Sequence, residues 1–166
     1  MTAESTRLEE QLRRAMEGGA WHGPAVLELL EGVTAEEARL HPIDGAHSIW
    51  ELVVHLSGTY RLVLRRLQGG AAQLTPEEDW PSLPEATDAN WRETIAQLRA
   101  LNDEARRAVT TFPAQRMDEL LISESPYTAY VQFIGLTQHD LYHAGQIALL
   151  KRALAARPSP RAALTD

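Results

Sequence analysis

The sequence predicts an all-α protein, a four-helix bundle in which one connection forms a long crossover. The 166-residue chain is rich in Ala, Leu, Arg and Glu, which favour helices. Its β-branched residues never form the alternating runs that are typical of strands. Four amphipathic stretches, separated by glycines and prolines, are enough to build a bundle around one buried core.

Glycine, proline and capping residues mark the first helices. The expected helices in this part of the chain span about 5–17, 25–31 and 35–40. Gly18-Gly19 ends the first, because two adjacent glycines favour a break. Pro24 suits the first turn of the second helix. Thr34 and Glu37 have the spacing of a capping box, in which each side chain bonds the other residue's backbone N–H, so they begin the third.

The best-marked helix begins after Ser48. Ser48 is a good N-cap residue, and Glu51 stands at the capping-box position. Apolar residues then recur at helical spacing as far as about Leu67, and Gly69-Gly70 favours the end of the helix there. We therefore expect one long, half-buried helix in this region.

The second half of the chain is expected to hold one long connection and two long helices. The expected elements are a loop over 71–87, a helix over 88–112, an irregular segment over 114–124 with a short extended piece at 117–122, a helix over 127–155 and a frayed tail over 157–166. Pro113 ends the first of these helices. Ser125-Pro126 caps the second, with proline at its first helical position.

Length and composition narrow the class of protein. We expect a single domain over 1–166, with the bundle over about 5–155 and a tail over 156–166. The chain has no cysteine, which excludes a disulfide scaffold, a thiolate nucleophile and cysteine-bound metal. Its net charge of −7 argues against a nucleic-acid-binding protein. No export signal or membrane-spanning run is recognisable, so we expect a cytoplasmic protein that does not bind membranes.

Three histidines predict a metal site. His139 and His143 are four residues apart on the apolar face of the last helix, so one ion can bridge both rings. His55, on the apolar face of the long helix after Ser48, is the best third ligand. Three histidines and an open position suit zinc, nickel or a similar divalent ion. The alternative is that these are core histidines held by hydrogen bonds.

Residues near these histidines have candidate supporting roles. Glu51, one turn before His55, is a candidate to orient the free ring nitrogen of His55, although the capping box already uses it. His47 is a candidate for the mouth of the site. Asp140 and Gln146 either support the histidine pair or face solvent. The cleft is expected to be walled by the segments 41–48 and 71–87. The two tryptophans expected in the core or the cleft wall are Trp21 and Trp50.

Longer stretches resemble the DinB/YfiT-like superfamily. They are WHGP over 21–24, a Leu27–Val33 segment, GAHSIWELVVHL over 45–56 and QHDLYHAGQI over 138–147. The resemblance covers about residues 5–155. The most specific part is the HSIWE run, with a histidine seven residues after its serine, followed far downstream by the histidine pair.

The resemblance implies a bundle with a long crossover and a divalent ion, zinc or nickel, held by His55, His139 and His143. It also implies a homodimer. Characterised relatives use bacillithiol, mycothiol or glutathione, which suggests a small-molecule substrate and a metal-dependent thiol S-transferase or a hydrolase-like enzyme. Two alternatives remain. One is a non-enzymatic metal-binding stress-response protein, and the other is a bundle that dimerises without metal.

Overall fold

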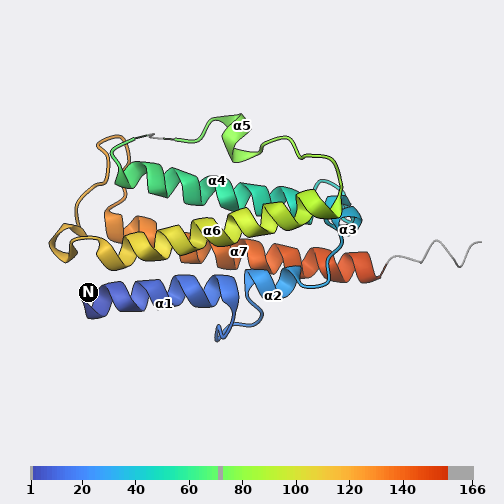
Figure 1. Ribbon diagram of the computed structural model, residues 1–166, viewed down its shortest axis with the longest axis horizontal. Coiled ribbons are helices and arrows are strands. Elements are labelled where there is room, and N and C mark those ends of the chain that lie inside the picture. The colour runs from blue at the N-terminus through green and yellow to red at the C-terminus, as the bar shows by residue number, and fades with distance from the viewer. Residues whose placement is uncertain (1, 71–72, 157–166) are drawn as a thin grey trace, which may run out of the picture.

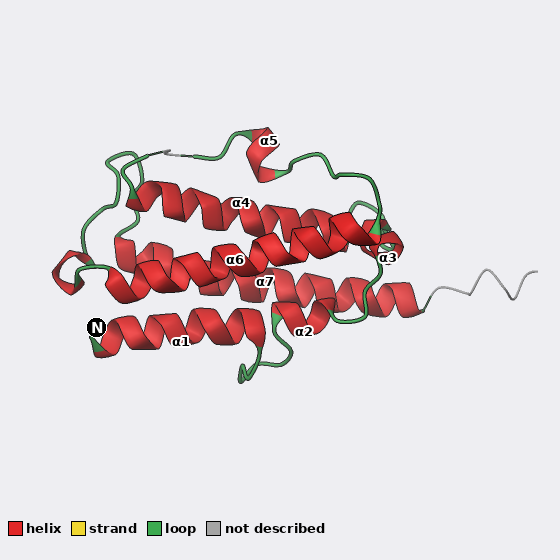
Figure 2. Cartoon of the chain, viewed as in Figure 1, coloured by secondary structure: helices red, strands yellow, loops and turns green. Residues whose placement is uncertain are grey.

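The computed structural model describes residues 2–70 and 73–156, and its regular structure is helical (Figure 2). In chain order the helices are α1 (Ala3–Glu17), α2 (Val26–Leu30), α3 (Ala35–Arg39), α4 (Ile49–Leu67), α5 (Pro76–Asp79), α6 (Asp88–Thr111) and α7 (Ala129–Ala155), with a 3₁₀ turn at Ala114–Arg116. Among the described residues, β pairing is limited to an isolated bridge between Leu120 and Thr128. The all-α class is therefore as predicted. No described helix has the length and apolarity to cross a membrane.

The four long helices, α1, α4, α6 and α7, lie side by side as a bundle (Figure 1). Both α1 and α4 contact α6 and α7. In Figure 1, α4 and α6 run toward one end of the bundle, whereas α1 and α7 run toward the other. Two helices that run in the same direction need a connection along the length of the bundle. The segment between α4 and α6 makes this connection on the outside, so the predicted long crossover is present.

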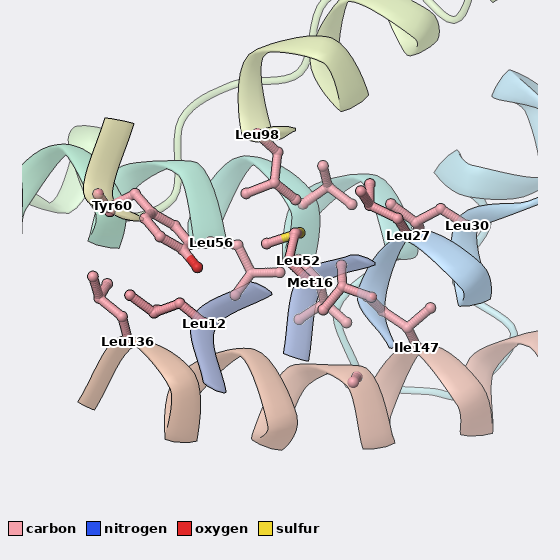
Figure 3. Close-up of a cluster of buried hydrophobic side chains, with 14 of the residues drawn as sticks. Leu12, Met16, Leu27, Leu30, Leu52, Leu56, Tyr60, Leu98, Leu136 and Ile147 are labelled. Atoms are coloured by element: carbon pink, nitrogen blue, oxygen red, sulfur yellow. The ribbon is translucent and has the colours of Figure 1, made fainter. Parts of the chain in front are cut away.

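Apolar side chains from all four long helices fill the centre of the bundle (Figure 3). The short helix α2 adds Leu27 and Leu30 at one end of this core. Trp50 is fully buried, as predicted, and its indole N–H donates to the Thr94 hydroxyl at 3.1 Å. Trp21, in contrast, is fully exposed, so its expected place in the core or cleft wall was wrong. It lies between the α1 and α2 helices, in a connection that leads away from the core.

Capping boxes begin several helices. The predicted pairs Thr34–Glu37 and Ser48–Glu51 are both present, at the start of α3 and of α4. The Ser48 hydroxyl accepts from the backbone N–H of Glu51 at 3.2 Å, and the Glu51 carboxylate accepts from that of Ser48 at 2.6 Å. Two backbone N–H groups at the start of the helix, which have no partner within the helix, are thus hydrogen-bonded.

The last helix begins at Ala129, and its N-cap is Thr128 rather than the residue pair predicted at 125–126. The N–H of Ala129 donates to the carbonyl oxygen of Glu119 at 2.9 Å, next to the isolated bridge. This pairing keeps the preceding chain extended. The Thr128 hydroxyl then accepts from the N–H of Val131 at 3.3 Å, which is the capping bond.

Two other helix boundaries differ from prediction. Helix α1 begins at Ala3, because Thr2 forms a capping box there with Ser5. Pro24 lies outside α2, whose N-cap is Ala25. The predicted frayed tail over 157–166 lies outside the described residues.

The connection over 71–87, predicted as a loop, contains α5. The Thr75 hydroxyl accepts from the N–H of Glu78 at 3.2 Å, and the Glu78 carboxylate accepts from that of Thr75 at 3.0 Å. Pro76 at the first helical position is already constrained to a helical φ. One capped turn therefore forms within a segment that shows no helical periodicity. We call residues 74–84 the strap.

The strap lies directly on α4 at Gly58. A Cβ atom at Gly58 would be only 2.8 Å from the carbonyl oxygen of Glu78, so this close approach requires glycine. About two turns further along α4, Arg65 donates to the Glu78 carboxylate at 2.7 Å. Gly58, which has no side chain, thus lets the strap approach the helix, and the Arg65–Glu78 ion pair holds it there.

A buried chain of hydrogen bonds connects α6, α4 and α7. The Asn102 amide donates to the Tyr60 hydroxyl at 2.8 Å, and this hydroxyl donates to an Asp140 carboxyl oxygen at 2.6 Å. Burial raises the pKa of Asp140 to about 8, although the Tyr60 hydrogen bond opposes the shift. Asp140 was predicted either to support the histidine pair or to face solvent. The structure shows neither role, because Asp140 is buried and bonded to Tyr60. Asp140 ties three helices together.

We predict that Tyr60→Phe lowers the free energy of unfolding by about 1–3 kcal/mol, because Asn102 and Asp140 both lose a partner in the buried core. Urea denaturation measures the change. Tyr130→Phe is the matched control, since Tyr130 is 38% exposed. Equal stabilities of the two variants would contradict the structural role given to Tyr60.

Candidate metal centre

Three histidine side chains meet between α4 and α7. His55 lies in the middle of α4, and His139 and His143 lie on successive turns of α7. The Nε2 atom of His139 is 3.1 Å from the Nε2 of His55 and 3.1 Å from that of His143. One nitrogen from each of the three rings lies within 4.8 Å of the other two. The structure therefore brings together the three histidines that the sequence singled out.

This spacing fits a divalent ion. Two nitrogens bound to one zinc ion at about 2.1 Å, with tetrahedral geometry, are about 3.4 Å apart. The observed separations of 3.1 Å lie close to this value. His55 and His143 are only 8% and 5% exposed, so water cannot easily pair with their ring nitrogens. These three histidines, two of them buried and His139 half-buried, can hold a metal ion.

Asp79 in the strap determines the tautomer of His55. The Nδ1 of His55 is 3.0 Å from an Asp79 carboxylate oxygen and 3.1 Å from the Asp79 carbonyl oxygen. Both oxygens accept hydrogen bonds, so Nδ1 must carry the hydrogen. The Nε2 lone pair of His55 consequently points toward the other two rings. Carboxylates commonly orient metal-binding histidines in this way.

Gln146 has the same effect on His143. The Nδ1 of His143 lies 2.7 Å from the side-chain oxygen of Gln146, one turn further along α7. With the hydrogen on Nδ1, the Nε2 of His143 also presents a lone pair. A neutral His139 carries at most one hydrogen on Nε2, which cannot serve both neighbours. A cation at this point pairs with all three nitrogens. Of the two roles left open for Gln146, support of the histidine pair is the one observed.

The surroundings of His139 and His143 favour the uncharged form of both rings. Burial, together with His143 and His55, lowers the pKa of His139 to about 3. Burial also lowers the pKa of His143, although the hydrogen bond that its Nδ1 donates to Gln146 opposes the shift. Neutral imidazole is the form that binds metal ions, so both rings are in the binding form at neutral pH.

Two aromatic stacks cover the site on the strap side. The Trp80 ring stacks on His55 with centroids 4.1 Å apart and on His47 with centroids 3.6 Å apart. His47 therefore lies close to the site, and its place at the mouth stays a prediction. The strap contributes both Asp79 and Trp80, which the sequence analysis did not single out. The capping-box spacing of Thr75 and Glu78 was the available signal for an ordered turn in this segment.

Glu51 does not orient His55. Its carboxylate accepts from the Ser48 backbone at 2.6 Å and lies 2.9 Å from the Nε2 of His41 and 3.6 Å from the Nδ1 of His47. The predicted alternative, the capping box, is correct. Although Glu51 is one helical turn from His55, the cap turns its carboxylate back toward the segment before α4.

A family model described as the DinB superfamily matches residues 9–147, and the chain belongs to this superfamily. The match includes His55, His139 and His143. No curated protein and no solved structure shows significant similarity to the chain.

In the protein without metal, His139 should contribute less and less to stability as the pH falls below about 6.5. In this range the unfolded chain takes up protons at histidine, whereas folded His139, with its pKa lowered to about 3, does not. The contribution of His139 to the free energy of unfolding therefore decreases from pH 7 toward pH 4, while Asp140, whose pKa is raised to about 8, contributes with the opposite sign. We expect the stability of His139→Gln relative to the unmodified protein to rise as the pH falls from 7 to 4, measured by urea denaturation in the presence of a chelator. His22→Gln, at an exposed position, should keep the slope of the unmodified protein.

We predict that Gly58→Ala weakens zinc binding about 10- to 100-fold, the usual effect of losing a partner that orients a ligand. The added Cβ would push the Glu78 carbonyl outward and move Asp79 away from His55. Gly135→Ala in α7 is the matched control, because no atom lies within 4 Å of its added Cβ. Both changes raise the helix propensity equally, so any difference in zinc affinity between the two variants comes from the displaced strap. Competition titration with a zinc-binding dye measures this difference. Equal affinities would contradict this role of the strap.

Proposed function

We propose that the protein binds a divalent ion, zinc or nickel, through His55, His139 and His143 and acts as a metal-dependent S-transferase. It would join a low-molecular-weight thiol of the bacillithiol type to a small electrophile. The observation that carries the proposal is the convergence of three Nε2 atoms, two of them held by acceptors at the opposite ring nitrogen. The resemblance to thiol-using relatives of the same superfamily supports the choice of reaction.

The donor set supports an open metal position. Three histidines form the cluster, and within residues 2–70 and 73–156 no fourth His, Asp or Glu joins it. Nitrogen donors suit zinc and nickel better than magnesium or calcium, which prefer oxygen. Three protein ligands and one exchangeable position are typical of catalytic rather than structural zinc sites.

A bound divalent ion lowers the pKa of a coordinated thiol and so supplies a thiolate near neutral pH. The chain has no cysteine, so the sulfur must come from a small molecule. The side chains of this protein orient the rings, through Asp79 and Gln146, and Trp80 shields His55 from water. The proposal includes a cytoplasmic location, where small thiols are kept reduced.

A second candidate is a non-enzymatic, metal-binding stress-response protein. The observation that favours it is the position of the cluster between two long helices. An ion bound by His55 on α4 and by His139 and His143 on α7 would link these helices and stabilise the folded state by mass action. This role needs no thiol and no electrophile.

We also propose that the protein forms a homodimer, as the superfamily resemblance implies. The outer face of α7 supports this. Between Ala129 and Leu150 the helix has one Asp and no Glu, Lys or Arg, and that Asp140 is buried. Tyr130, Val131 and Tyr142 are exposed along it. An uncharged face can pair with its own copy across a two-fold axis. Sedimentation equilibrium measures the mass in solution.

Thiol consumption tests the proposed reaction. We expect purified protein loaded with zinc or nickel to accelerate the loss of bacillithiol in the presence of a reactive electrophile. His143→Ala should lose the bound metal and the rate enhancement together, whereas His22→Ala should keep both. The metal content is measured on protein without a histidine tag.

The outcomes separate the candidates. Metal binding that raises the melting temperature without any thiol loss would favour the second candidate. No metal uptake, with unchanged melting on addition of zinc, would exclude both.

A further inference from the structure

A cavity lies between the strap, α4 and α6. It has a volume of about 390 Å³, which is within the range of small-molecule binding pockets. Its apolar lining comes from Leu64 of α4, Leu101 of α6 and Leu74 of the strap. None of the three histidines of the candidate metal centre lines it. The cavity is therefore a separate space in which an apolar group can pack.

Hydrogen-bond donors line the α4 wall of this cavity. Arg61 and Arg65 of α4 and Gln68 at its C-cap follow one another at spacings of four and three residues. This spacing places the three side chains on one face of the helix. A guanidinium group has five donors and no acceptor, and a carboxylate is the acceptor that matches its geometry best. The α4 wall therefore complements a ligand that carries a carboxylate.

The protein does not pair all the donors of the two arginines. The Nη1 of Arg65 donates to Glu78 at 2.7 Å, but its Nε is buried and has no hydrogen-bond partner within residues 2–70 and 73–156. Arg61 donates to the neutral side-chain oxygen of Gln97 at 3.3 Å, and it takes part in no ion pair within the same residues. Buried donors without a partner are rare in folded proteins. A carboxylate that contacts both arginines would supply the acceptor.

The opposite wall limits the charge of the ligand. Glu104 of α6 lines the cavity and forms no ion pair among the described residues. Glu78 also lines it, but Arg65 already pairs with this carboxylate. A second negative charge on the ligand would meet the unpaired Glu104, and like charges repel. The cavity therefore favours a single negative charge on an apolar body.

We propose that this cavity binds a small amphipathic carboxylate, with one negative charge on a medium-length alkyl or aryl group. The carboxylate lies along α4, between Arg61 and Arg65. The apolar group packs against Leu64, Leu74 and Leu101. This site goes beyond the metal-dependent reaction and does not depend on it, because no histidine of the cluster takes part.

Calorimetric titration with octanoate tests the proposal. The protein is first freed of metal with a chelator, so that no metal ion can bind the carboxylate. Octylammonium, which has the same chain length and the opposite charge, is the matched ligand. Because the protein has a net charge of −7, non-specific attraction favours octylammonium. We expect octanoate to bind at one site and more tightly than octylammonium. It should also bind roughly tenfold more tightly than hexanoate, since two more methylenes are buried.

Substitutions locate the bound carboxylate. Arg61→Gln should weaken octanoate binding about threefold to tenfold, because one charged donor is lost. Arg99→Gln, at an exposed position of α6 outside the cavity, is the matched control and should keep the affinity of the unmodified protein. Glu104→Gln should reduce the preference for octanoate over octanedioate. Circular dichroism checks that each variant is folded.

Three results would overturn the proposal. They are no binding of octanoate, tighter binding of octylammonium than of octanoate, and equal affinities of Arg61→Gln and Arg99→Gln for octanoate. The last result would show that the carboxylate binds elsewhere on the protein. None of these results bears on the metal site, which is tested by uptake of zinc or nickel.

Discussion

The packing of α4 against α7 is the constraint on which the site depends. His55 lies between the buried residues Leu52 and Leu56, and His143 is next to the buried Ala144. The apolar contacts that close the bundle therefore also bring the Nε2 atoms of His55 and His143 each to 3.1 Å from that of His139. Burial at this point lowers the pKa of His139 and of His143, so both rings keep lone pairs available at neutral pH. Core packing and the convergence of the three histidines are here two consequences of one helix pair.

The crossover, which the topology of the bundle requires, also contributes residues to the site. Because α4 and α6 run in the same direction, the chain must return along the bundle between them (Figure 1). On this path Gly58 lets the strap lie on α4, and the strap then places Asp79 and Trp80 against His55. The hydrogen bonds to Nδ1 determine which nitrogen of His55 faces the cluster. The connection between α4 and α6 therefore determines the tautomer of His55, a candidate metal ligand.

The two sides of the cluster differ in character. The strap side is closed by the stacked rings of His47, Trp80 and His55, and on the side toward the end of α7 Gln146 accepts from Nδ1 of His143. A chain without cysteine needs an external thiol for the proposed reaction, and a cluster with three protein ligands leaves a position for it.

Much of this protein could be predicted from sequence because the signals are local. Helical spacing placed His139 and His143 on one face, capping boxes located Ser48 and Thr34, and apolar periodicity indicated the buried faces. The roles of Asp79, Trp80 and Glu51 could not be obtained in this way. Asp79 is 24 residues from His55 in the chain, and only the path of the strap over Gly58 brings the two together. Glu51 is close to His55 in sequence, but its cap directs it elsewhere.

The sequence by itself determined which residues form helices and which faces are buried, since these depend on neighbours within a few turns. Tertiary structure alone decided which groups orient the histidines, because hydrogen bonds between distant segments depend on how the backbone is routed.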